Sequence, residues 1–294
     1  MAFKPRLVKG KAIEIHPLVT GGFNADFDGD TMSVFLPISA PAVKESHSML
    51  PSNNLFSPTT GAVMYTPGHE ALLGTYLASL PGKRTTKKFK TSREALSAQR
   101  AGTIDMTDII RVDGHETTAG RLKIEETLPK ALQETGRKKA SQMTVMHKRG
   151  MGKLLLDVAK KYPNRYGEVA NSLKDLGNNH STNIGFSIGL KDFAPINAKE
   201  RDSMLAAAEV KVRAVKRGSG SGAVKHGKII KIYEGVDDRL EVLNNAHLRK
   251  NPTNVFRMVV SGARGSPSQL KQIISTPALV KDAKDRVVPY FIPN

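Results

Sequence analysis

The sequence predicts an α+β fold, and three observations lead to this prediction. Apolar and polar residues alternate over residues 11–16 and 31–36, which is typical of short strands. Apolar residues recur at helical spacing over residues 69–80 and 198–217. Clusters of Gly, Pro and Asn separate these stretches and indicate turns.

The remaining elements follow from the same patterns. We expect an ordered loop over 51–68, a basic surface over 83–100, and strands and turns over 104–129. Further helices are predicted over these ranges: 41–50, 137–161, 166–176, 229–248 and 266–274, the last with Ser266 as its N-cap. The helices at 198–217 and 229–248 flank a Gly-Ser link and predict a helical hairpin.

The chain is strongly basic. It has 294 residues, with 45 Lys or Arg against 27 Asp or Glu, a formal net charge of +18 and a pI near 10.0. Such a field attracts polyanions, so nucleic acid is the leading partner class, with an architectural protein or a solvated basic surface as alternatives.

Several chemistries are excluded by composition. The absence of cysteine excludes disulfides, thiol catalysis and cysteine-ligated zinc. No apolar h-region begins the chain and no run approaches the ~18 apolar residues of a membrane span. We therefore expect a soluble, intracellular protein with no membrane partner.

One acidic loop stands out in this basic chain. Asp26, Asp28 and Asp30 alternate within the string NADFDGD, and Gly29 permits a tight bend that lets three carboxylates converge. Carboxylate oxygens suit Mg²⁺, and a divalent cation would offset their repulsion. The spacing also opens an EF-hand loop, but Thr31 and Pro37 occupy the positions that need Gly and Glu, which leaves an acidic solvent turn as the alternative.

The surroundings of this loop resemble a known family. Residues 7–37, LVKGKAIEIHPLVTGGFNADFDGDTMSVFLP, are similar to the barrel segment of the largest subunit of cellular RNA polymerases, called β′ in bacteria. Similar segments follow in family order: SNNLFSPTTGAVMYTP at 52–67 with HEALLGTYLAS after it, TTAGRLKIEETLP at 117–129 as a strand, NIGFSIGLKDF at 183–193 and SGARGSPSQLKQI at 261–273.

The resemblance implies an architecture. Residues 1–82 would form part of a double-psi β-barrel with the metal loop, and 83–196 a basic mixed α/β region of pore or funnel type. Residues 197–250 would form a helical hairpin at the rim of the secondary channel, and 251–294 a loop segment that precedes the bridge helix.

The resemblance also implies roles for individual residues. Asp26, Asp28 and Asp30 would be catalytic and would hold one Mg²⁺, while a second ion would arrive with the nucleoside triphosphate. Asn24 would contact the incoming ribose, with a turn-forming Asn as the alternative. Arg264 would belong to a supporting loop, or else serve in packing or capping.

Pieces of the family's β′ subunit do not match this sequence. The first half of the barrel, the bridge helix and the trigger loop have no counterpart, so we expect other chains to complete the barrel. This indicates a split β′ subunit, such as occurs in RNA polymerases of giant bacteriophages, with a truncated piece of a longer polypeptide as the alternative. The location would be the cytoplasm of the infected bacterial host, or the virion.

The predicted function is that of the catalytic-site subunit of a DNA-dependent RNA polymerase, a nucleotidyltransferase. Its partners would be β-like chains, the remaining β′ pieces, DNA template, RNA and nucleoside triphosphates. The first alternative is a non-catalytic DNA-binding assembly module, which would have no use for three converged carboxylates. The second is a metal-dependent nuclease. For a nuclease we would expect a constellation of further His, Glu or Lys residues near the triad, and this sequence lacks it.

Overall fold

The computed structural model of the chain describes residues 1–133 and 144–292. They form two compact units, residues 1–185 and 186–294. Within the described ranges, none of the helices is long and apolar enough to cross a lipid bilayer. Helices and small sheets both occur, which confirms the α+β prediction.

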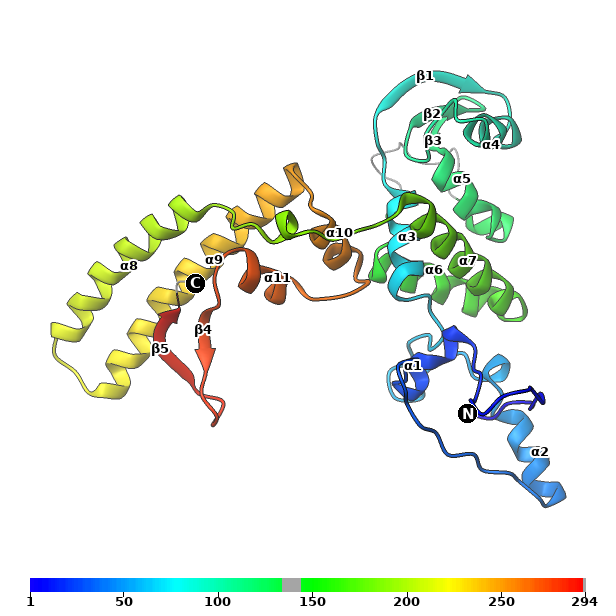
Figure 1. Ribbon diagram of the computed structural model, residues 1–294, viewed down its shortest axis with the longest axis horizontal. Helices are drawn as coiled ribbons and strands as arrows, with labels where there is room; N and C mark the ends of the chain where they lie inside the picture. Colours follow the sequence, from blue (N-terminus) through cyan, green and yellow to red (C-terminus); the bar gives the residue numbers. More distant parts are fainter. Residues whose placement is uncertain (134–143, 293–294) are drawn as a thin grey trace. The chain divides into compact units, whose positions relative to one another are not determined.

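The first unit contains seven α-helices and one three-stranded sheet among its described residues (Figure 1). Its elements are α1 (Thr20–Phe23), α2 (Ala40–Ser48), α3 (His69–Ser79), β1 (Arg84–Phe89), α4 (Ser92–Arg100), β2 (Ile109–Val112), β3 (His115–Thr118), α5 (Ala119–Glu126), α6 (Lys148–Lys161) and α7 (Tyr166–Ile184). Short 3₁₀ turns lie at Pro17–Val19, Pro51–Asn53, Lys130–Leu132 and Pro163–Arg165.

The core of this unit forms where α3 and α7 meet. Every residue from Ala71 to Ser79 is buried, and the Ser181 hydroxyl of α7 donates a 2.8 Å hydrogen bond to the carbonyl of Glu70. The apolar side chains of α5, α6 and α7 close the same cluster. Burial of this apolar surface is the main favourable term in the stability of the unit.

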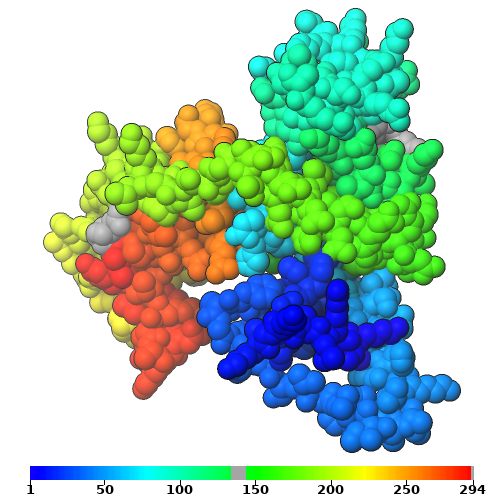
Figure 2. Space-filling view, turned by 45° about the vertical axis from the view of Figure 1, so that its right-hand side comes forward, coloured from blue at the N-terminus to red at the C-terminus, as the bar shows by residue number. Residues whose placement is uncertain are grey.

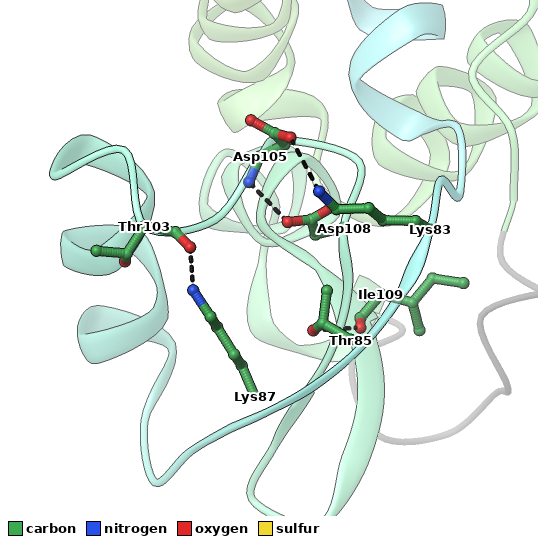
Figure 3. A network of polar contacts seen from close by, with 7 residues as sticks. All are labelled: Lys83, Thr85, Lys87, Thr103, Asp105, Asp108 and Ile109. Atoms are coloured by element: carbon green, nitrogen blue, oxygen red, sulfur yellow. Dashed lines mark hydrogen bonds and ion pairs between the residues drawn. The ribbon is translucent and has the colours of Figure 1, made fainter.

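The three-stranded sheet has the order β1-β2-β3, with β1 parallel and β3 antiparallel to β2. The Thr85 hydroxyl of β1 donates a 3.0 Å hydrogen bond to the carbonyl of Ile109 (Figure 3). Lys83, just before β1, lies 3.9 Å from a carboxylate oxygen of Asp108. Part of the basic surface predicted over 83–100 is therefore edge strand, where lysine side chains hinder pairing with other chains.

The second unit consists of α8 (Ala198–Arg217), α9 (Gly222–Lys250), α10 (Asn254–Ser261), α11 (Pro267–Ile274) and the antiparallel pair β4 (Ala278–Lys281) and β5 (Val287–Ile292), with a 3₁₀ turn at Leu190–Phe193. Helices α8 and α9 run side by side and pack through a buried apolar seam (Figure 1). Two packed helices therefore occupy the part of the chain where the hairpin was predicted.

Several predicted elements differ from the structure. No strand forms over residues 11–16 or 31–36, so the chain carries no sheet around its acidic loop within the described residues. Val34, Phe35 and Ile38 are 79%, 87% and 90% exposed. The sequence pattern is that of a strand, but a strand needs a hydrogen-bonded partner, and the described residues supply none there.

The segment 117–129 is also not a strand throughout. Of this segment, only Thr117 and Thr118 pair in the sheet, as the end of strand β3 (His115–Thr118). The hydroxyl of Thr118 then accepts a 3.1 Å hydrogen bond from the N–H of Arg121, and helix α5 begins. A threonine that satisfies a free N–H of the first turn favours helix over continued strand.

The ends of several other helices differ from the predicted ones. Helix α7 continues to Ile184, well past the predicted end at 176, and α9 begins at Gly222 rather than 229. The helix predicted over 137–161 is present from Lys148, while residues 137–143 lie outside the described residues. The β4–β5 hairpin in the predicted loop segment 251–294 was not expected.

Candidate metal centre

The acidic loop follows a short anchored segment of chain. Leu18 and Val19 are buried in the main apolar cluster of the first unit. The 3₁₀ turn that contains them begins where Nδ1 of His16 accepts a 3.1 Å hydrogen bond from the N–H of Leu18. Packing of this apolar pair fixes the base of the loop and leaves its polar residues at the surface.

Asn24 links this anchor to the loop. It ends helix α1 in the left-handed conformation, at φ 50°, and its N–H points to the carbonyl of Gly21 at 3.5 Å. Asparagine tolerates this conformation better than most residues. Its side chain is exposed, so the structure shows a capping role for its backbone and leaves its amide accessible.

The three aspartates come together in the structure. Asp26, Asp28 and Asp30 each offer one carboxylate oxygen, and these oxygens all lie within 4.8 Å of one another. The N–H of Asp26 donates to a carboxylate oxygen of Asp30 at 3.3 Å, and the N–H of Asp28 donates to one of Asp26 at 3.4 Å. Gly29, at φ 130°, makes the bend that a side chain would strain.

The electrostatics of the loop favour a cation. The pKa of Asp28 is raised above its ordinary value by a hydrogen bond with Asp26, by the negative charge of Asp26 and, to a smaller extent, by that of Asp30. Mutual repulsion of carboxylates raises their pKa because ionisation of one disfavours ionisation of the next. All three side chains are exposed and supply only oxygen donors, a set that fits Mg²⁺ with several retained waters.

The remaining candidate residue, Arg264, belongs to the second unit. It lies in the turn between α10 and α11, where its N–H points to the carbonyl of Met258 at 3.5 Å. Its side chain is exposed. The basic residues Lys9 and Lys11 are also exposed, on the N-terminal segment that forms part of the surface drawn in dark blue (Figure 2).

Sequence reasoning missed the anchor of the loop. The anchor consists of the buried residues Leu18 and Val19. The sequence feature that could have predicted it is an apolar pair directly after Pro17, since proline is a favoured first residue of a helical turn.

Comparison with known proteins shows which protein families this chain is similar to. Residues 1–51 match the family described as RNA polymerase Rpb1, domain 2, and residues 54–193 match RNA polymerase Rpb1, domain 3. Each of these two regions is therefore similar to one domain of the RNA polymerase Rpb1 family.

Individual relatives give the same result at the level of the subunit. The DNA-directed RNA polymerase subunits β′ of Syntrophomonas wolfei and Desulforamulus reducens are each 31% identical over 98% of this chain. That of Thermotoga maritima is 31% identical over 97% of it. The chain is thus homologous to the β′ subunit of DNA-directed RNA polymerase, and it spans 26%, 25% and 18% of these three relatives.

Proposed function

We propose that this chain supplies the metal-binding loop of the active centre of a DNA-dependent RNA polymerase. The observation that carries the proposal is the convergence of Asp26, Asp28 and Asp30 within 4.8 Å, on a chain homologous to β′ subunits. A surface that only binds nucleic acid gains nothing from three exposed carboxylates, because they repel phosphate.

In this function Asp26, Asp28 and Asp30 hold one Mg²⁺ and help to receive a second that accompanies the nucleoside triphosphate. When bound, these ions supply positive charge to the attacking 3′-oxygen of the RNA and to the leaving pyrophosphate. The exposed amide of Asn24 can exchange hydrogen bonds with a ribose 2′-hydroxyl, which a deoxyribonucleotide lacks. Arg264 belongs to the loop that supports the bridge helix and the folding trigger loop.

The barrel around the loop is completed by other polymerase chains. Val34, Phe35, Leu36 and Ile38 are exposed, and the segment that contains them has no strand partner among the described residues. Pairing with strands of the missing barrel half would satisfy its backbone and bury these side chains. The partners are the remaining β′ pieces and β-like chains, together with DNA template and RNA.

The chain is one piece of a β′ subunit that is split among several polypeptides, as in giant bacteriophages. Its site of action is the cytoplasm of the infected bacterium, or the virion if the enzyme is packaged.

The test uses the native complex, isolated through a tag on this chain, in RNA primer extension on a DNA–RNA scaffold with Mg²⁺. Wild type, Asp28→Ala and Asp238→Asn are compared, since Asp238 is an exposed aspartate of α9 outside the loop. Mass spectrometry of each sample identifies the chains that co-purify.

Three results together support the proposal. The wild-type and Asp238→Asn complexes synthesise RNA, an intact Asp28→Ala complex does not, and the missing barrel half co-purifies with the chain. Equal extension by all three complexes would show that the chain is a non-catalytic assembly module. Isolation of this chain without polymerase partners would refute the split-subunit part of the proposal.

A further inference from the structure

The hairpin of α8 and α9 has a well-defined apolar seam. Val212 of α8 and Ile229, Tyr233 and Val236 of α9 are buried in it. Only residues 218–221, of sequence GSGS, connect the two helices. Ala278 of β4 and Phe291 of β5 belong to the same cluster, so the strand pair covers a further side of α9. The sides of the two helices that face neither each other nor this strand pair are available to other molecules.

Charge is divided unequally along this hairpin. Residues 210–231, called the hairpin tip below, contain seven Lys or Arg and no Asp or Glu. The rest of the hairpin, residues 198–209 and 232–250, contains five Lys or Arg against seven Asp or Glu, a formal charge of −2. The tip, at +7, is therefore a local cationic surface and does not simply reflect a basic helix pair.

The cations of the tip are accessible. Six of the seven are exposed and one is half-buried: Lys211, Arg213, Lys216, Arg217, Lys228 and Lys231 are the exposed ones, and Lys225 is the other. Two of the seven cations contact other groups of the hairpin. The guanidinium of Arg213 lies 3.3 Å from the carboxylate of Glu209, and Lys225 donates a 3.1 Å hydrogen bond to the carbonyl of Lys216. The other five side chains form no ion pair within the described residues.

The arrangement of these cations fits an extended anion. Lys225, Lys228 and Lys231 are spaced three residues apart, so they are neighbours along one side of α9. The connecting link carries only glycine and serine, so no large side chain keeps a ligand from the ends of the helices. A row of like charges repels itself, and a chain of phosphates relieves that repulsion.

We propose that the hairpin tip binds the phosphodiester backbone of a nucleic acid without reading its sequence. An acidic protein is the less suitable partner, because the centres of protein interfaces are depleted in lysine and enriched in aromatic residues. The tip has no Phe, Tyr or Trp, and its large exposed apolar side chains are only Val210 and Val224. The absence of these three residue types also argues for backbone contact over base stacking.

This site stands independently of the acidic loop, which belongs to the other unit. It adds a nucleic-acid contact to the chain whether or not the three aspartates hold a metal. The two proposals can therefore fail separately, and the experiment below includes a readout for each.

The test measures fluorescence anisotropy of a labelled DNA duplex, and of single-stranded DNA and RNA of equal length, on titration with the full chain at several salt concentrations. The first variant replaces Lys225, Lys228 and Lys231 by Gln. The matched control replaces Lys153, Lys160 and Lys161 by Gln, which removes the same charge from exposed positions of α6 in the first unit. A third variant with Arg at 225, 228 and 231 keeps the charge.

For the duplex, we expect the first variant to lower affinity at least about tenfold at moderate salt and to reduce the slope of log affinity against log salt by roughly 2 to 3. The control should lose much less, and the Arg variant should bind like wild type. Comparison of the three nucleic acids identifies the backbone that the tip prefers.

Equal losses in the Gln variant and its control would overturn the proposal, since net charge alone would then explain binding. Displacement of the duplex by polyglutamate at equal charge concentration would assign the tip to acidic proteins instead. Circular dichroism checks that the helices persist, and Mn²⁺ binding by the hairpin variants reports separately on the acidic loop.

Discussion

The carbonyl oxygen of Gly177 lies where a Cβ atom of Gly74 would have to stand, so α3 and α7 touch backbone to backbone. In the opposite direction, a Cβ on Gly177 would meet the carbonyl of Ala71. Both separations are below 3.0 Å, a distance that real Cβ atoms essentially never show. The central helix pair of the first unit therefore depends on the absence of two side chains.

Replacement of Gly177 by Ala should accordingly destabilise the first unit. Because the obstacle is backbone, the helices must separate, and we expect a loss of about 1–3 kcal/mol in the free energy of unfolding, measured with urea. The matched control is Gly167→Ala in the same helix, where the structure shows nothing within 4 Å of the added atom. This control should be neutral or stabilising by up to about 1 kcal/mol. Equal effects of the two substitutions would contradict the close contact.

Metal binding at the acidic loop should depend on pH through Asp28. Repulsion and a hydrogen bond within the triad raise the pKa of its carboxyl above the ordinary value of 3.8, so a proton competes with the cation at higher pH than it would at an isolated aspartate. Mn²⁺ affinity, followed by electron paramagnetic resonance, should fall as pH falls through this raised pKa. In Asp28→Asn the affinity should be weaker throughout and its change with pH smaller. A pH profile identical to that of wild type would assign the dependence to another group.

His180 should make the first unit less stable in mild acid. Burial, and to a lesser extent the charge of Lys123, lower the pKa of His180 below 6.5 in the folded chain. The unfolded chain then binds the proton more tightly, so this contribution to stability is complete above about pH 6.5 and is lost as pH falls toward the folded pKa.

Thermal unfolding between about pH 7.5 and 5.5 measures this effect. His180→Gln should make the melting temperature decrease less steeply as the pH falls. The control is His47→Gln, since His47 is exposed. His16, whose pKa is also lowered, accounts for a remaining slope in the His180 variant. An unchanged slope in His180→Gln would show that its protonation does not affect unfolding.

The cap of α11 should contribute measurably to the second unit. The hydroxyl of Ser266 accepts a 3.2 Å hydrogen bond from the N–H of Gln269, whose side chain accepts a 2.9 Å bond from the N–H of Ser266. Ser266→Ala should lower the free energy of unfolding of this unit by about 1 kcal/mol. The control is Ser219→Ala in the exposed link between α8 and α9. Retention of full stability in Ser266→Ala would mean that solvent replaces the cap at no cost.

Local sequence signals predicted much of the helical structure. The helices predicted over 69–80 and 198–217 and the cap at Ser266 are confirmed, because helix formation and capping act within one or two turns of the chain. Helix α3 is buried on all sides from Ala71 to Ser79, so its burial is not limited to one apolar face. The signals were weaker where one residue can serve two elements. Thr118 ends a strand and caps a helix, and only the structure shows which role determines the residues that follow.

Composition alone accounts for the acidity of the loop, the charge of the hairpin tip and the absence of thiol chemistry. The folded chain shows in addition that the carboxylates of Asp26, Asp28 and Asp30 converge and that Leu18 and Val19 anchor their loop. It also shows that residues 31–36 form no strand with any of the described residues. Helix periodicity and charge are properties of neighbouring residues, whereas strand pairing and side-chain convergence depend on groups distant in the chain or in another chain.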